Sequence, residues 1–134
     1  MAETIISFQN IAKSFGDNKV YESLNLDVLR GETLTIIGGS GVGKSVCLKL
    51  LIRLLIPDSG TIHAFGESVG ELDARGLLRL RSRIAMLFQG AALFDSMTVE
   101  ENIKYPLIEH NWGTPGEMDK RVTEVLEMVD MPGI

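Results

Sequence analysis

The stretch Gly38-Gly39-Ser40-Gly41-Val42-Gly43-Lys44-Ser45 decides the fold that we predict for this chain. It follows the β-branched run Thr33-Leu34-Thr35-Ile36-Ile37, which predicts a strand, and it opens a segment with helical spacing. The apolar residues of that segment predict one helix face that packs on a sheet: Leu48, Leu51, Ile52 and Leu55. A strand, a glycine-rich turn and a helix in this order indicate an α/β fold.

Such a loop can wrap the phosphates of ATP. Glycines allow turns with positive φ, and they let successive amide hydrogens point into one concavity at the positive end of a helix. We expect Lys44 to place its charge on the β- and γ-phosphates and the Ser45 hydroxyl to ligate the bridging Mg²⁺. The alternative is a chance match in a glycine-containing loop, but the strand before the loop and the helix after it favour phosphate binding.

Composition limits the classes of function. The 134 residues are 45% hydrophobic and 23% charged, which is typical of one soluble globular domain. The net charge of -5 is negative, whereas binding to the phosphates of nucleic acid needs positive charge, so we expect no nucleic-acid partner. The single cysteine, Cys47, cannot form an internal disulfide and is expected to be buried. The run Leu54-Leu55-Ile56 is far too short to cross a bilayer, so work at a membrane would need partners.

The N-terminal pattern predicts an antiparallel pair of strands. Ile5 to Ile11 reads as a strand, Gly16-Asp17-Asn18 as a turn, and an alternating second strand follows with Leu24, Leu26 and Val28. Further on, Thr61 to Phe65 predicts a strand. Leu72 to Arg83 predicts a helix with a solvated basic face made of Arg75, Arg79, Arg81 and Arg83.

The C-terminal part is expected to be loop and helix. Thr98 with Glu101, and Thr114 with Glu117, can each cap a helix start reciprocally. The second of these helices should bury one face: Met118, Val122, Val125, Leu126 and Val129.

Gln89 is the one candidate for a role in hydrolysis. It ends the apolar run Ile84 to Phe88, which predicts a strand covered on both faces, and α/β proteins bind ligands at such strand ends. The alternative is an ordinary polar residue at a strand end. Because no apolar strand ending in Asp-Glu follows, the sequence supports ATP binding but not hydrolysis by this chain alone.

The loop Gly38 to Ser45, followed by Phe88-Gln89, resembles the ATPase subunit of ABC transporters. Other segments fall in the order that this family shows: Asn10 to Phe15, Leu24 to Gly31 and Pro57-Asp58-Ser59-Gly60. The resemblance implies that Phe15 stacks on adenine, although it could also be a core aromatic. It also implies that Val46 completes the nucleotide site and that Gln89 reaches Mg²⁺ and the attacking water.

A narrower resemblance lies in residues 86 to 103 and Tyr105-Pro106-Leu107, which are similar to the ATPase of MCE-type lipid transport systems. It implies transport of phospholipid or a related lipid and a homodimer of ATPase subunits at the cytoplasmic face of the inner membrane. A permease would dock near residues 90–107, with MCE lipid-binding proteins beyond it, unless Gly90 to Phe94 is only a mobile surface loop. The alternatives are an ATPase of an amino-acid type importer and a truncated nucleotide-binding module that does not hydrolyse ATP.

The expected fold is therefore α/β, a P-loop NTPase with an incomplete RecA-like core. Residues 1–89 would form the N-terminal antiparallel β-subdomain and part of the P-loop core, and residues 90–134 the Q-loop and the start of the helical subdomain. Gly39 and Val46 depart from the family, where proline and a second hydroxyl residue are common. The signature segment, the Walker B strand and the switch histidine are expected to be lacking, because His63 and His110 come too early.

Overall fold

The computed structural model describes residues 2–41 and 43–134. It divides into two compact units, Met1–Met86 and Leu87–Ile134, which are described separately. Among the described residues, no helix combines the length and the apolar character that a membrane span requires.

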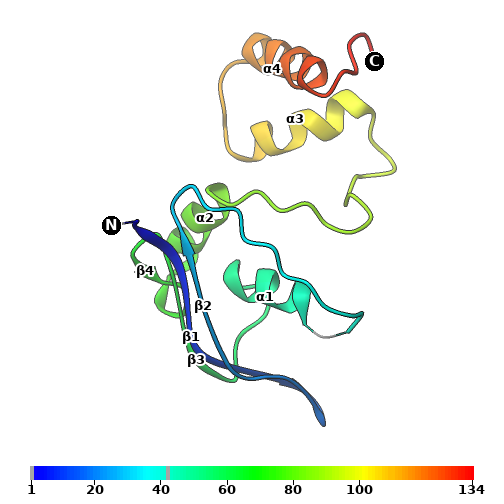
Figure 1. Cartoon of the computed structure of the whole chain (residues 1–134). Coiled ribbons are helices and arrows are strands. Elements are labelled where there is room, and N and C mark those ends of the chain that lie inside the picture. The colour runs from blue at the N-terminus through cyan, green and yellow to red at the C-terminus, as the bar shows by residue number, and fades with distance from the viewer. Residues whose placement is uncertain (1, 42) are drawn as a thin grey trace. The chain divides into compact units, whose positions relative to one another are not determined.

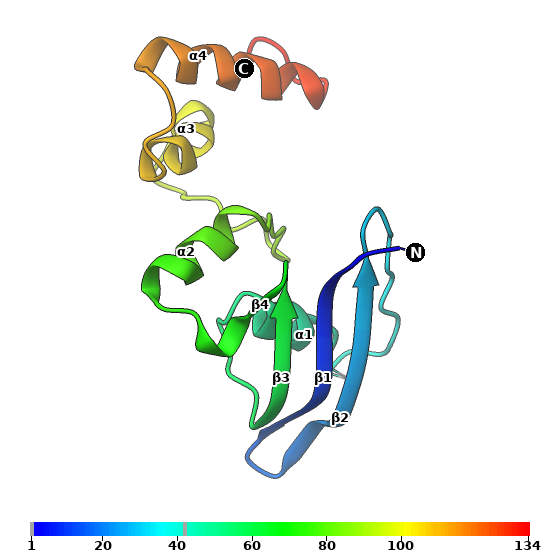
Figure 2. The same cartoon turned by 90° about the vertical axis from the view of Figure 1, so that its left-hand side faces the viewer.

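The first unit is built on an antiparallel sheet with the strand order β2-β1-β3-β4 (Figures 1 and 2). Its strands are β1 (Thr4–Phe15), β2 (Asn18–Leu29), β3 (Ser59–Ala64) and β4 (Glu67–Ser68). The predicted hairpin around residues 16–18 is confirmed, and so is the strand predicted from Thr61.

A bulge in β1 decides which side chains enter the core. Phe8 and Ile11 are both buried, at 3% and 0% exposure, although residues three apart in a regular strand point to opposite faces. The pairing of β1 shifts register between these two residues, and Asn10 adopts a φ of 51°. The side-chain oxygen of Asn25 accepts a hydrogen bond from the Asn10 N–H at 2.9 Å and holds the bulge.

Helix α1 (Lys44–Leu51) packs on this sheet, and its predicted apolar face is confirmed in part. Cys47, Leu50 and Leu51 are buried, whereas Leu48 is 46% exposed. Leu51 and Ile52 are buried and Leu55 packs against the core, as predicted, although Ile52 and Leu55 lie past the helix end. Only Leu48 departs from the prediction. Apolar residues occur almost all around this segment, and their spacing alone could not choose the face.

The remaining helical segments of the first unit are the 3₁₀ turn η1 (Val69–Glu71) and α2 (Ala74–Ser82). The helix predicted from Leu72 to Arg83 is confirmed. Of its arginines, which were predicted to be solvated, two contact other parts of the first unit. The guanidinium of Arg81 donates to the carbonyl oxygens of Ile52 (3.0 Å) and Arg53 (3.2 Å). That of Arg83 lies 3.7 Å from the centre of the Phe65 ring. These two arginines therefore tie α2 to the core.

Two predicted strands do not form. Residues 33–37 and 84–88 have no regular secondary structure and pair with no strand among the described residues. Ile37 and Leu87 are each 89% exposed. An extended segment makes no backbone hydrogen bonds within itself, so an apolar run of this kind becomes a strand only where neighbours pair with it. Gln89 consequently lies in a turn and not at a strand end, which corrects that expectation.

The second unit holds α3 (Val99–Glu109) and α4 (Pro115–Met128). Both predicted capping boxes are confirmed, at Thr98 with Glu101 and at Thr114 with Glu117. The ammonium of Lys104 on α3 pairs with Glu100 on its own helix and with Asp119 on α4. Val122 and Leu126 are the buried residues of α4, while Val129 lies past the helix end and is exposed.

Candidate nucleotide-binding site

The glycine-rich loop turns sharply before α1. Gly41 and Gly43 have φ values of 79° and 97°, in the left-handed region that favours glycine. The carbonyl oxygen of Gly43 accepts the first bonds of the helix, from the N–H groups of Val46 at 3.0 Å and Cys47 at 3.3 Å. The N–H groups of the first α1 residues have no acceptor within the helix and can therefore bind an anion.

The ammonium of Lys44 folds back onto the loop. Its Nζ donates to the carbonyl oxygen of Gly38 at 2.6 Å and also to that of Gly39. The charge is thus held against the backbone of the loop, where a bound phosphate would meet it. The ammonium therefore lies against the first two residues of the glycine-rich loop.

Strand β2 supports the loop from behind. The hydroxyl of Tyr21 donates to the carbonyl oxygen of Gly43, and a Cβ added at Gly43 would collide with Cγ1 of Val20 and lie 3.1 Å from Tyr21. Only glycine fits at this position. The sequence analysis missed this support, because nothing in the local pattern shows which β2 residues face the loop.

Cys47 is buried beneath the loop, as predicted. Only 4% of it is exposed, and burial raises the pKa of its thiol to about 11. The thiol is therefore neutral at physiological pH. A hollow of about 290 Å³ adjoins it, lined by Tyr21, Leu24, Leu26, Leu34, Thr35, Ile36, Ile37, Lys44 and Cys47. Its lining is mainly aliphatic, so it differs from the polar loop beside it.

The other predicted site residues differ in their placement. Ser45 is exposed in the first turn of α1, whereas the half-buried Val46 packs against the core. Phe15 ends β1 and is 45% exposed, so its ring is open to a ligand. Gln89 belongs to the second unit and is exposed. Val42 lies outside the described residues.

The site fits Mg²⁺ only together with a triphosphate. No group of three or more His, Cys, Asp or Glu side chains in the described part of the chain could hold a metal ion. Mg²⁺ that is bound to ATP takes most of its ligands from phosphates and water, and the exposed hydroxyl of Ser45 could add one more.

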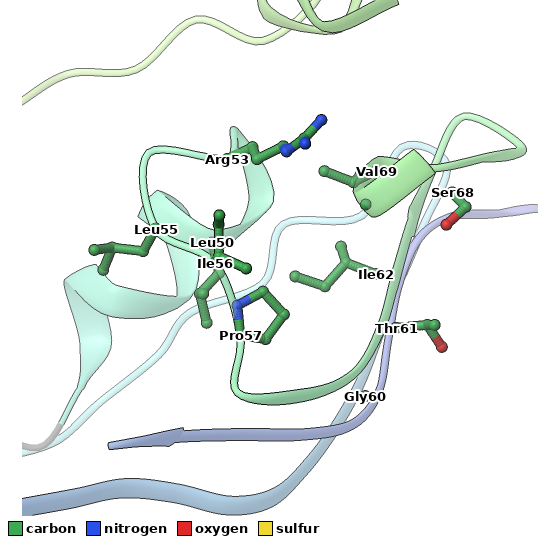
Figure 3. A pocket seen from close by; sticks show the side chains of 11 residues that line it. Leu50, Arg53, Leu55, Ile56, Pro57, Gly60, Thr61, Ile62, Ser68 and Val69 are labelled. Atoms are coloured by element: carbon green, nitrogen blue, oxygen red, sulfur yellow. The ribbon is translucent and has the colours of Figure 1, made fainter. Parts of the chain in front are cut away.

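A second hollow lies between the end of α1 and β3 (Figure 3). Its volume is about 110 Å³ and its lining is mainly aliphatic, including Leu50, Ile62 and Val69. The one charged side chain, Arg53, donates to the carbonyl oxygen of Leu72 at 2.7 Å. Ligand pockets usually measure roughly 300–1,000 Å³ with convergent polar groups, so this hollow is a packing defect and not a nucleotide site.

The glycine loop, its lysine and the antiparallel sheet beside them can be compared with known proteins. The family model described as ABC transporter matches residues 21–134. The chain belongs to the ABC transporter family. The family match includes the glycine-rich loop Gly38 to Ser45, α1 and the whole second unit.

Curated members of the ABC transporter family resemble nearly the entire chain. A probable ribonucleotide transport ATP-binding protein of Mycobacterium leprae is 39% identical over 96% of this chain and 37% of its own length. The intermembrane phospholipid transport ATP-binding protein MlaF of Haemophilus influenzae is 35% identical over 99% and 50%. A methionine import ATP-binding protein of Paraburkholderia xenovorans is 41% identical over 94% and 34%. The chain thus spans half or less of the length of these relatives.

A solved ABC structure agrees with the fold. A dimeric ATP-binding cassette in a post-hydrolysis state, bound to ADP and phosphate, superposes with a TM-score of 0.80 at 29% identity. The match covers 94% of this chain and 57% of that one. The fold class predicted from sequence, an incomplete α/β P-loop domain with an N-terminal antiparallel β-subdomain, is confirmed.

Proposed function

We propose that this chain binds Mg²⁺-ATP through Gly38 to Ser45. The observation that carries the proposal is the ammonium of Lys44 held by the carbonyl oxygens of Gly38 and Gly39, inside a loop that leads into a helix N-terminus. A triphosphate is the ligand whose charge and shape suit both the ammonium and the free N–H groups of a helix start.

Each site residue then has a role. The backbone N–H groups of the loop glycines, Ser40, Lys44 and Ser45 donate to phosphate oxygens, and Val46 completes the site at the start of α1. The Lys44 ammonium neutralises the charge between the β- and γ-phosphates, the Ser45 hydroxyl ligates Mg²⁺, and the Phe15 ring stacks on adenine. Bound Mg²⁺ would neutralise charge that develops on the phosphates. Gln89 would orient the attacking water.

In the longer protein to which its relatives correspond, the chain would form part of a transport ATPase. Two ATPase subunits would act together on the cytoplasmic face of the inner membrane, and a permease would dock near residues 90–107. We propose phospholipid or a related lipid as the cargo, with MCE lipid-binding proteins reached through the permease. The phospholipid transport relative, which matches 99% of this chain, supports this proposal.

A small solute is the second candidate cargo. The methionine import relative is 41% identical to this chain, against 35% for the phospholipid transport relative, so overall identity does not favour lipid. ATPase activity of the assembled transporter, stimulated either by phospholipid vesicles or by amino acids, would distinguish the two cargoes.

Calorimetry of the Lys44→Ala variant tests nucleotide binding. We expect wild-type protein to bind Mg²⁺-ATP and the variant to lose binding, because the loop keeps its amides but lacks the cation. Lys49→Ala, which removes the same charge from the last turn of α1, is the matched control and should bind normally. Undiminished affinity in Lys44→Ala would remove the site.

Substitution of Leu93 tests the docking surface. Leu93 is 67% exposed, beyond Ala91 and Ala92, which have φ values of 63° and 55°. In the assembled transporter, Leu93→Asp should uncouple transport and leave ATP binding intact. Leu78→Asp makes the same change at an exposed leucine of α2, outside residues 90–107, and should transport normally. A fully active Leu93→Asp transporter would contradict the assignment.

A further inference from the structure

Asp58, directly before β3, contacts the end of β1 at successive residues. One carboxylate oxygen accepts a hydrogen bond from the Ser14 N–H at 2.7 Å, and the other accepts from the Lys13 ammonium at 3.2 Å. The N–H of Asp58 itself donates to the carbonyl oxygen of Ala12 at 2.9 Å. One residue therefore restrains the last part of β1 through both backbone and side chain.

The strand register explains why this restraint is needed. The pairing of β1 with β3 ends where Ala12 faces Ser59, but β1 continues to Phe15. Beyond that point Ser14 and Phe15 pair only with β2. A strand with one open edge has backbone groups without strand partners, and the Asp58 carboxylate takes the Ser14 N–H in place of a longer β3. The end of β1 is thereby fixed on both edges.

Lys13 extends the restraint to the aromatic ring. Its ammonium lies 5.2 Å from the centre of the Phe15 ring, within the range of a cation–π contact. Lys13 and Phe15 are two residues apart, so they lie on the same face of the strand. The Lys13 side chain is only 14% exposed, whereas Phe15 is 45% exposed. The ring is thus held in place while much of its surface stays open.

We infer that Asp58 is a positioning residue that preorganises Phe15 as the platform for the base of ATP. This inference rests on the proposed nucleotide site. Asp58 touches no part of that site directly; it acts through Ser14 and Lys13. The Ser14 N–H and, after it, the Lys13 ammonium lower the pKa of the Asp58 carboxyl, so it is ionised at neutral pH and can hold both partners.

A comparison of two ligands separates positioning from general support of the fold. Mg²⁺-tripolyphosphate can occupy the phosphate loop but has no base to stack on Phe15. By calorimetry, Asp58→Ala should raise the Kd of Mg²⁺-ATP about fivefold, part of what complete loss of base stacking would cost. The Kd of Mg²⁺-tripolyphosphate should stay within about twofold of wild type, because the loop itself is unchanged.

Two further variants sharpen the test. Asp58→Asn keeps an acceptor for the Ser14 N–H but loses the charge that holds Lys13, so the Kd for ATP should rise less than in Asp58→Ala. If Asp58→Ala does not unfold cooperatively, the affinities of Asp58→Asn for the two ligands are the test. Asp27→Ala removes a carboxylate from an exposed position of β2 and should bind both ligands as wild type does. In a Phe15→Ala background, Asp58→Ala should add no further loss of ATP affinity.

The outcomes are distinct. Unchanged ATP affinity in both Asp58 variants, or equal loss of ATP and tripolyphosphate binding in Asp58→Asn, would overturn the positioning role while leaving the nucleotide site in place. Failure of the wild-type protein to bind either ligand would overturn the proposed function and this inference together.

Discussion

The hydroxyl of Tyr21, on β2, donates a hydrogen bond to the carbonyl oxygen of Gly43, the residue that precedes α1. The first strand pair of the chain is therefore joined to the glycine-rich loop. We expect Tyr21→Phe to lower the free energy of unfolding by about 0.5–1.5 kcal/mol, the net value of one such bond. The effect should be no larger, because the Val46 and Cys47 N–H groups still donate to the same carbonyl oxygen.

Urea denaturation measures this difference. Tyr105→Phe is the matched control, since its hydroxyl makes no hydrogen bond to another described residue. Equal stability of Tyr21→Phe and wild type would show that the bond does not hold the loop. Weaker ATP binding in Tyr21→Phe alone would show that it does.

A side chain at Gly43 should be strongly destabilising. Its φ of 97° is unfavourable for any other residue, and a Cβ would collide with Val20. We expect Gly43→Ala to cost about 2–4 kcal/mol of unfolding free energy from backbone strain and overpacking. Gly39→Ala adds the same methyl group to the same loop where nothing lies within 4 Å, and it should change stability by less than about 0.5 kcal/mol. Similar costs for the two variants, measured in urea, would contradict the contact with β2.

Alkaline pH should destabilise the first unit. Burial raises the pKa of Cys47 from 9.0 to about 11, and burial, followed by the proximity of Cys47, raises that of Tyr21 above 10.0. A raised pKa means that the neutral form is favoured in the folded state. The stabilisation is complete below about pH 9 and is lost as the pH rises through the folded pKa values.

For Cys47 the loss should be on the order of 2 kcal/mol. Unfolding free energies measured from about pH 8 to about pH 11 should therefore fall in the wild type. In Cys47→Ala the fall should begin at a higher pH, because the contribution of the raised Tyr21 pKa remains. A pH profile that is identical in both proteins would show that the thiol does not contribute.

Asn102 should hold the segment before α3 in place. Its side-chain oxygen accepts from the Phe94 N–H at 2.8 Å, and its amide nitrogen donates to the carbonyl oxygens of Phe94, Met97 and Thr98 at 2.9–3.2 Å. Asn102→Ala loses all of these bonds, so we expect a loss of about 1–2 kcal/mol from the second unit and faster hydrogen exchange at the Phe94 amide.

A second substitution of Asn102 and a control variant test this prediction further. Asn102→Asp keeps the bond from Phe94 but brings a carboxylate near three carbonyl oxygens, so it should be at least as unstable as Asn102→Ala. In the control Glu109→Ala, at the exposed end of α3, the Phe94 amide should exchange hydrogen at the wild-type rate. Unchanged protection of Phe94 in Asn102→Ala would show that the segment is ordered by other contacts, such as the Phe94 and Tyr105 rings with centres 4.8 Å apart.

Local signals in the sequence determined the hairpin, the glycine loop with its lysine, both capping boxes and the burial of Cys47. Each depends on residues close together in the chain, so spacing and residue type are enough to predict it. Tertiary structure decided the rest. Packing left Leu48 exposed and buried Leu50 instead. Residues 33–37 and 84–88 did not become strands, because a strand needs hydrogen-bonded neighbours. The contacts of Tyr21, Arg81 and Asp58 join residues far apart in the chain, and only the packing of sheet and helices brings them together.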